Sequence, residues 1–435
     1  MERKHFPLGP AVFSYPKLVR DDVLSDTLRK VVLAIVLTRS SLDPIFEIVN
    51  FGSSGSGVGG ILNSLVILIA VTFVVCRTYL LPAWTVWMWA PYLGICAATL
   101  VLAPEFGLAL RLYLSVLSYA AFFFFPFFIL RHSSDLSRFL AVTLCSAIIP
   151  VSYGLLTAVA SIGDPDARVQ GTFAHPNILA FFLVLQIALV LFVQVSTAIA
   201  WSARTRRLIL LALPVLVLLL LETKTRSAWG AAGALFFIFA IWCDRRVLLV
   251  LLLSPLALLF DVGITERLSD LQGGLGAQDL DQLDEETRVN SYVWRVVLWS
   301  SSMPWFWERP LFGYGIGAFR FFSTEFFPLL IDGQGVDAHS LYVQTMFEVG
   351  IIGLLALLLV FAAACYQLLK GRQYDRLGTV IMLGIVATYL IEAYSDNIWY
   401  YLSFNCYFYF VLGSMCAWLR LEKTKSDLHR GRAAP

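Results

Sequence analysis

The sequence is poor in charge. Of its 435 residues only 14% are Asp, Glu, Lys or Arg, whereas 59% are hydrophobic, and the mean hydropathy is +0.76. Soluble domains carry about 25% charged and about 45–50% apolar residues. The composition therefore excludes an ordinary soluble domain and indicates a polytopic membrane protein.

Concentrated positive charge is also absent. The formal net charge is +2, and the lysines and arginines are scattered along the chain rather than gathered on one stripe. Nucleic-acid-binding domains need a basic patch or stripe. We therefore exclude nucleic acid as a partner.

Cysteine is scarce where it would matter for a disulfide or a metal. All seven lie in or at the ends of apolar segments, and the large polar stretch has none. Neither a disulfide framework nor a CxxC metal site is predicted.

The polar N-terminal stretch is followed by a short apolar run without a small-residue cleavage site, so no cleaved signal peptide is expected.

Long apolar runs are abundant. A helix needs about 20 apolar residues to cross a bilayer, and twelve candidate runs occur at residues 24–37, 61–76, 81–102, 109–130, 139–162, 178–201, 208–221, 227–243, 247–262, 341–369, 377–394 and 401–419. We predict an all-α polytopic membrane protein with about 12 transmembrane helices and a large helical periplasmic loop between helices 9 and 10. The predicted parts are helices 1–9 in residues 1–263, a periplasmic catalytic loop in 264–340, helices 10–12 in 341–421 and a cytoplasmic tail in 422–435.

The lysines and arginines predict the orientation, because short cytoplasmic loops carry the excess of these residues. Most of the 32 fall on one side when both termini are placed in the cytoplasm, and the large loop then lies outside. The basic residues left on the outer side are concentrated near histidine, tryptophan and glycine clusters, although outer arginines can also simply reach lipid headgroups.

The first outer motif is R-V-Q-G-T-F-A-H-P-N at residues 168–177. Gly171 and Pro176 predict a turn, and we expect Asn177 to cap the helix that follows. Donors and a helix N-terminus would then face one aqueous pocket suited to an anion. A purely structural turn with a capped helix explains the same residues.

Two further motifs supply arginines. Arg226 ends a five-residue turn at the membrane face, where a surface ion pair with Glu222 would contribute little stability. Residues 287–303 predict a surface helix, on which Arg288 and Arg295 share a face about 10 Å apart along the axis. A helix that only anchors the loop to the membrane is the alternative.

The last two motifs are a glycine run and a histidine cluster. The G-x-G-x-G run at residues 313–317 allows close backbone approach, but it follows no predicted strand and so does not indicate a nucleotide fold. His339 begins H-S-L-Y-V-Q, and its imidazole is able to accept a proton from a sugar hydroxyl near pH 7. A helix-entry histidine bonded to the backbone is the alternative. His175 and His339 have no convincing third ligand, so no metal site is predicted.

Together these motifs resemble the bacterial O-antigen polymerase and O-antigen ligase superfamily of membrane glycosyltransferases. The resemblance rests on R-x-x-G-T-F-x-H-P-N from Arg168, T-R-S-A at 225–228, R-x-x-x-W with G-x-G-x-G-x-F from Arg295 to Phe319, and H-S-x-x-x-Q-x-x-x-E-x-G from His339. It implies a bacterial inner-membrane enzyme acting on glycans carried by undecaprenyl pyrophosphate, with no metal and no cofactor.

The resemblance also implies residue roles. Arg168, Arg226 and Arg295 become the candidates for binding pyrophosphate, and Arg288 is a weaker one. His339 is the candidate that activates or orients the acceptor hydroxyl. The substrate-binding residues expected around them are His175, Asn177, Tyr342 and Gly315, while Glu348 is expected to be structural.

Three functions fit the motifs. The leading interpretation is a polymerase that joins lipid-linked oligosaccharide repeats into O-antigen or exopolysaccharide. Its acceptor would be a glycan, and a chain-length regulator is a candidate partner protein. A ligase would instead transfer the finished chain to lipid A core. A transporter of lipid-linked oligosaccharide is the third, although transport predicts polar residues at mid-membrane, whereas charge here gathers at the outer face.

Overall fold

The computed structural model describes residues 23–48, 50–51, 56–164, 167–249, 251–252, 291–330 and 333–433. Its regular structure is helical apart from the two-residue strands β1 (Asn50–Phe51) and β2 (Ser56–Gly57), which pair antiparallel. The α-helices are α1 (Val23–Ile48), α2 (Val58–Arg77), α3 (Ala83–Thr99), α4 (Phe106–Ile129), α5 (Asp135–Cys145), α6 (Ile148–Ala160), α7 (Pro176–Val195), α8 (Ala203–Leu210), α9 (Leu213–Glu222), α10 (Arg226–Trp242), α13 (Ser291–Glu308), α14 (Ala318–Phe326), α15 (Leu341–Gly371), α16 (Arg376–Ser395) and α17 (Leu402–Ala433). Short 3-10 turns are η1 (Thr78–Leu80), η2 (Leu100–Leu102) and η4 (Ile398–Tyr400).

Eight helical segments within the described ranges are long and apolar enough to cross a membrane. They coincide with eight of the twelve predicted runs, and the all-helical membrane fold is confirmed. The run at 208–221 forms the two short helices α8 and α9, and the run at 227–243 forms α10, which is shorter than a usual span. Most of the run at 247–262 lies outside the described residues.

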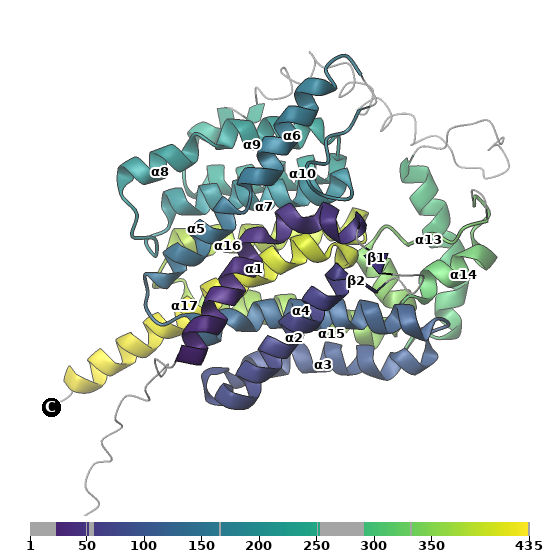
Figure 1. Ribbon diagram of the computed structural model, residues 1–435, viewed down its shortest axis with the longest axis horizontal. Helices are drawn as coiled ribbons and strands as arrows, with labels where there is room; N and C mark the ends of the chain where they lie inside the picture. The colour runs from purple at the N-terminus through teal and green to yellow at the C-terminus, as the bar shows by residue number, and fades with distance from the viewer. Residues whose placement is uncertain are drawn as a thin grey trace, which may run out of the picture.

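Two helices form the centre of the bundle. In α7, 89% of the apolar window is buried inside the protein, and in α17 the share is 94%, against 28% in α2. A helix that is hydrophobic on every side belongs in the interior. The helix α17 packs on α4, and α7 packs on α9 and α16 (Figure 1).

Aromatic rings fill the space between these helices. Tyr389 of α16 stacks on Phe408 of α17 with ring centroids 4.0 Å apart, and Trp89 of α3 meets Tyr409 edge-on at 5.2 Å. Offset and edge-on ring pairs add about 0.5–1.5 kcal/mol beyond their buried area. The aromatic pairs therefore help to fix the positions of α3, α16 and α17.

The two ends of the bundle differ. The start of α1 and the end of α17 lie at the same end of the molecule, whereas α13 and α14 lie at the opposite end (Figure 1). A second hydrophobic cluster, which includes Val297, Leu298, Phe319 and Phe347, joins α13 and α14 to the first turns of α15. The described part of the polar loop is thus a packed unit fixed to one end of the bundle.

A kink in α15 explains the glycine run. Gly350 has φ 71° and ψ −177°, which interrupts the helix, and the segment between α13 and α14 supplies the missing backbone partners. The amide of Gly315 donates to the carbonyl of Glu348 at 2.8 Å, and the amide of Ile351 donates to the carbonyl of Pro310 at 2.9 Å. The G-x-G-x-G run therefore serves close packing against α15.

Replacing Gly313 should destabilise this docking. A Cβ there would lie 2.3 Å from the carbonyl oxygen of Phe347, and the backbone has φ 64°. We expect Gly313→Ala to cost about 1–3 kcal/mol, measured as a lower midpoint of thermal unfolding in detergent. Gly333→Ala is the matched control, because its φ is 65° but nothing lies within 4 Å of the added Cβ. Equal losses in both variants would show that backbone strain, and not the close contact, is responsible.

Candidate active site

The segment before α7 is tied to the turn between α9 and α10. The guanidinium of Arg168 donates from Nε to the carbonyl oxygen of Thr223 at 2.9 Å. Its Nη2 donates to Oδ1 of Asn177 at 2.9 Å and to Oγ1 of Thr225 at 3.1 Å. Two motifs that are more than 40 residues apart in the sequence are therefore in direct contact, as expected for parts of one site.

The cap of α7 is His175, so the expectation that Asn177 caps this helix was wrong. Nδ1 of His175 accepts the backbone N–H of Asn177 at 3.1 Å, and Pro176 is the first residue of the helix. A proline at the first helical position keeps the preceding residue extended, which makes that residue the cap. The carboxamide of Asn177 is thereby released to face the site.

A carboxylate that the sequence motifs did not single out lies at the centre of the site. Asp396 follows α16 and is only 1% exposed. Its side chain accepts from Nδ2 of Asn177 at 2.5 Å, from the backbone amide of Asn397 at 2.7 Å and from the hydroxyl of Tyr401 at 2.8 Å. The signal that would have found it is an acidic residue in the short turn between the last two apolar runs.

The surroundings of Asp396 favour its charged form. Burial alone would raise its pKa, but the imidazole of His339, with Nδ1 3.9 Å from Oδ1, and the donors Asn177 and Tyr401 outweigh burial and lower the pKa. Hydrogen bonds that stabilise a carboxylate have this effect. The site therefore contains a buried negative charge at neutral pH.

His339 lies between that carboxylate and solvent. Its backbone has φ 46°, a left-handed conformation that is rare outside glycine and is concentrated at functional sites. The ring lies 5.4 Å from the ring of Trp294, and the side chain is 42% exposed. An imidazole so placed is paired with Asp396 on one side and remains accessible to a substrate.

Two arginines approach from other helices. Arg226 is the first residue of α10, and Arg295 is a half-buried residue of α13. Burial lowers the pKa of Arg295, and the charge of Arg226 lowers it further, while Asp396 and Tyr401 act in the opposite direction. Because such influences require proximity, the two guanidinium groups and the Asp396 carboxylate share one region.

The pKa of His175 depends on several of the same charged groups. Burial lowers its pKa first, Arg168 and His339 lower it further, and Asp396 opposes them. A neutral ring is also what the helix cap requires, because Nδ1 accepts a hydrogen bond. The residue is therefore neutral at pH 7.

The structure brings together most of the predicted site residues. Four segments that are distant in sequence converge on Asp396, and they contribute the predicted residues Arg168, His175, Asn177, Arg226, Arg295 and His339. Besides Asp396, the region contains the carboxyl group of Asp337, whose pKa is raised by burial toward the neutral form. The three guanidinium groups therefore leave a positive excess. Such a site suits a ligand with more than one negative charge.

Three predicted residues are not placed in this cluster. The hydroxyl of Tyr342 donates to the carbonyl oxygen of Leu390 at 2.7 Å, and the amide of Gly315 donates to the carbonyl of Glu348. These are contacts between packed segments. Arg288 lies outside the described residues, so its predicted role stays a prediction.

Among the described residues, no group of three or more His, Cys, Asp or Glu side chains is arranged to hold a metal ion. Most polar groups of the cluster are hydrogen-bond donors, namely the N–H groups of arginine and asparagine and the hydroxyl of tyrosine. Groups of this kind bind anions. The geometry thus favours an anionic ligand.

A comparison with protein families agrees with this geometry. Residues 208–358 match the family model described as O-antigen ligase. No curated protein matches the chain. The family match confirms the resemblance to the O-antigen polymerase and ligase superfamily, whose members are membrane glycosyltransferases and ligases that use lipid-linked glycans.

The matched region includes part of the site. Arg226, Arg295 and His339 fall inside the matched residues 208–358, whereas Arg168 and Asp396 lie before and after them. The hydrogen bonds of Asn177 join these outer segments to each other. The site is therefore completed by residues beyond the matched domain.

The lowered pKa of His175 predicts a pH-dependent loss of stability. A histidine with a lower pKa in the folded than in the unfolded protein takes up a proton on unfolding, so stability should fall as the pH drops below about 6.5. His175→Asn keeps a good helix cap but does not titrate. We expect its unfolding midpoint to fall less than that of the wild type between about pH 7.5 and 5.5.

The control for this measurement is His132→Asn, because that histidine side chain is 78% exposed. Its unfolding midpoint should follow the wild type. An identical pH response in wild type and His175→Asn would contradict the assignment of a neutral imidazole with a lowered pKa at position 175.

Proposed function

We propose that the protein polymerises oligosaccharide repeat units carried on undecaprenyl pyrophosphate, by metal-independent glycosyl transfer at the periplasmic face of the bacterial inner membrane. The observation that carries the proposal is the convergence of Arg168, Arg226 and Arg295 on the pair formed by His339 and Asp396. A cationic cluster beside a histidine provides what the reaction needs.

The arginines suit the leaving group. In the proposed reaction, the acceptor hydroxyl oxygen bonds to the anomeric carbon while the bond from that carbon to the phosphate oxygen breaks, and the lipid pyrophosphate leaves with the electron pair. Negative charge grows on the departing oxygen. Each charge-assisted hydrogen bond from a guanidinium contributes about 1.5–3 kcal/mol, and those that strengthen as charge develops accelerate the step.

His339 suits the acceptor. The hydroxyl must lose its proton as it attacks, and a neutral imidazole within reach accepts that proton. The carboxylate of Asp396, 3.9 Å from Nδ1 of His339, then stabilises the positive charge on the ring. This arrangement requires that Asp396 stay ionised, in agreement with its lowered pKa.

A cavity beside Arg168 suits a lipid-linked donor. It has a volume of about 700 Å³ and is lined by Arg168 together with Tyr153 and Thr157 of α6 and Phe173 of the preceding loop. The helix α6 belongs to a candidate membrane span, and its Leu156 side chain is 69% exposed, as expected for a lipid-facing residue. A donor held in the bilayer can therefore approach Arg168 sideways past α6.

The arrangement of the two ends supports the proposed orientation. The start of α1 and the end of α17 lie together, and α8, with Arg204, Arg206 and Arg207, lies toward the same end (Figure 1). Cytoplasmic segments are enriched in such residues. We therefore assign both termini to the cytoplasm and the unit of α13 and α14 to the periplasm.

A ligase is the second candidate, because the matching family model is described as O-antigen ligase. Polymerase and ligase use the same donor and differ in the acceptor, which is a growing glycan in one and lipid A core in the other. The cluster described above serves the donor in either reaction. The choice between them therefore depends on the acceptor assay below.

Substitutions at the site should abolish transfer without removing the protein. We expect Arg295→Ala and His339→Ala each to lower the rate by about 10²- to 10³-fold, since one loses a stabilising charge and the other a general base. The rate is measured with purified protein in liposomes and a defined lipid-linked repeat unit. Arg309→Ala is the control, because that guanidinium lies over the ring of Tyr314, 4.8 Å from its centroid. Full activity of both site variants at normal protein levels would refute these roles.

The same assay separates polymerase from ligase. Purified protein given only lipid-linked repeat units should produce a ladder of lipid-linked polymer, and adding lipid A core should leave that ladder unchanged. A product that forms only when lipid A core is present would identify a ligase instead. A deletion strain gives the matching result: single repeats remain if the polymerase is lost, and long lipid-linked polymer remains if the ligase is lost.

A further inference from the structure

The buried side chain of Gln344 connects the two halves of the His339 and Asp396 pair. It lies one turn into α15 and is 3% exposed. Its Oε1 accepts the backbone amide of Ala338 at 2.8 Å and Nδ2 of Asn397 at 2.9 Å. Ala338 directly precedes His339, and Asn397 directly follows Asp396, so a single oxygen atom joins the two segments.

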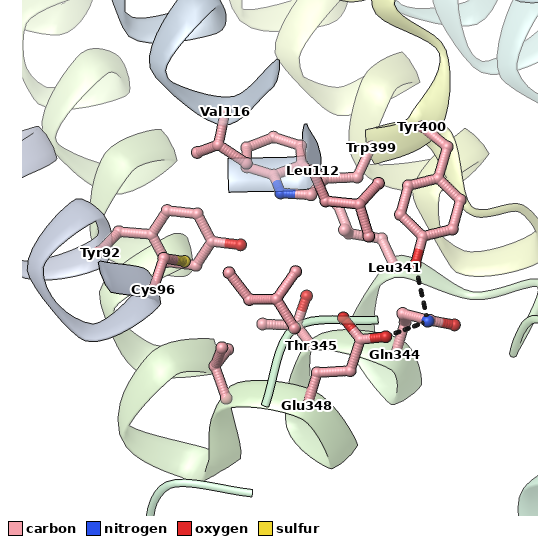
Figure 2. A pocket seen from close by; sticks show the side chains of 12 residues that line it. Tyr92, Cys96, Leu112, Val116, Leu341, Gln344, Thr345, Glu348, Trp399 and Tyr400 are labelled. Carbon is pink, nitrogen blue, oxygen red and sulfur yellow. Dashed lines mark hydrogen bonds between the residues drawn. The ribbon is translucent and has the colours of Figure 1, made fainter. Parts of the chain in front are cut away.

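The orientation of this carboxamide is determined by its neighbours. Its Nε2 donates to Oε1 of Glu348 at 2.5 Å and to the hydroxyl of Tyr400 at 2.9 Å (Figure 2). The two groups at Oε1 are N–H donors, and the carboxyl of Glu348 offers an acceptor, so a flipped amide would oppose donor to donor. Glu348 therefore holds Gln344 in the orientation that the site requires.

The peptide before His339 is held from both sides. The amide of Ala338 donates to Gln344, and its carbonyl oxygen accepts Nε1 of Trp299 at 2.7 Å. His339 itself has φ 46°, and such a conformation persists where the surrounding structure determines it. The contacts of Gln344 and Trp299 supply that restraint.

We propose that Gln344 is a positioning residue for glycosyl transfer, which sets the distance between the His339 imidazole and the Asp396 carboxylate through its bonds to Ala338 and Asn397. The inference rests on the proposed function, because it concerns the pair that accepts the proton. Loss of this link displaces the imidazole from the carboxylate while the arginines that bind the donor stay in place.

The test is the substitution Gln344→Met, which keeps length and volume but removes all four hydrogen bonds. In liposomes with a defined undecaprenyl-pyrophosphate-linked repeat unit, we expect kcat to fall about 10- to 100-fold, as displacement of a reacting group by about 1 Å produces. The KM for the lipid-linked donor should change less than about threefold. Gln186→Met is the matched control, because Gln186 is equally buried but bonds to the carbonyl of Thr143 in the interior of the bundle.

A double-mutant cycle distinguishes positioning from general stability. Asn397→Leu should lower kcat in the same way, and adding it to Gln344→Met should cause little further loss, because both remove one link. The proposal is overturned if Gln344→Met keeps kcat within twofold, if kcat and KM change together, or if the two losses multiply. Should Gln344→Met fail to fold, Trp299→Phe tests the same peptide from its other side, and an unchanged kcat there overturns the proposal.

A readout without transfer separates this inference from the proposed function. The rate at which diethyl pyrocarbonate modifies His339, relative to the exposed His132 of the same molecule, should rise severalfold in Gln344→Met and not in Gln186→Met. An unchanged rate overturns the positioning role. If the wild-type protein transfers no sugar, the proposed function is overturned. The modification rate of His339 then still tests whether Gln344 positions that histidine.

Discussion

The buried carboxylate of Asp396 is the group around which the site is built. Removing a carboxylate from water costs several kcal/mol, and the cost is offset only by well-placed donors and positive charge. Asn177, Tyr401 and His339 provide them, with Arg295 close by. The bond from Asn177 joins residues 219 positions apart. The carboxylate therefore forces segments from both halves of the chain to meet at one point.

The helix α15 connects this point to the rest of the bundle. Its first turns carry Gln344 and Glu348, and its kink at Gly350 receives the backbone of the segment between α13 and α14. The α13 helix that carries Arg295 is thereby fixed to the same helix that follows His339. A rigid support of this kind is needed because catalytic groups must be held to within a fraction of an ångström.

Much of the fold was predictable because apolar length is a local property of the sequence. Eight of the predicted runs coincide with long apolar helices. The motif residues Arg168, Arg226, Arg295 and His339 were predicted as one group, and the structure places them in one region. Both predictions depend on residues that are close together in the sequence.

The parts that escaped prediction depend on contacts between distant segments. Asp396 belongs to no motif, and its role follows from Asn177 and His339 reaching it across the fold. The cap of α7 is His175 because Pro176 begins the helix, and the carboxamide of Asn177 is bonded to Arg168 and Asp396 instead. Gly315 was assigned to substrate by its pattern, yet its amide bonds to the carbonyl of Glu348. A local glycine pattern indicates where the backbone allows close approach. Tertiary packing determines which group approaches it.

The negative charge of Asp396 and the positive charges of the arginines also affect the energy of the transition state in the proposed reaction. Arg295 is half-buried, and burial lowers the pKa of its guanidinium. In the absence of a donor, the Asp396 carboxylate supplies compensating negative charge. A pyrophosphate that enters beside it adds negative charge, and the attraction is strongest when the lipid pyrophosphate has just separated from the sugar. Arg168 is already held by Thr223, Asn177 and Thr225. A guanidinium fixed in this way needs little rearrangement at that moment, so its stabilisation favours the transition state over the bound donor. The buried carboxylate thus keeps the cations assembled before the donor arrives and remains available to the protonated His339 after the acceptor hydroxyl has reacted.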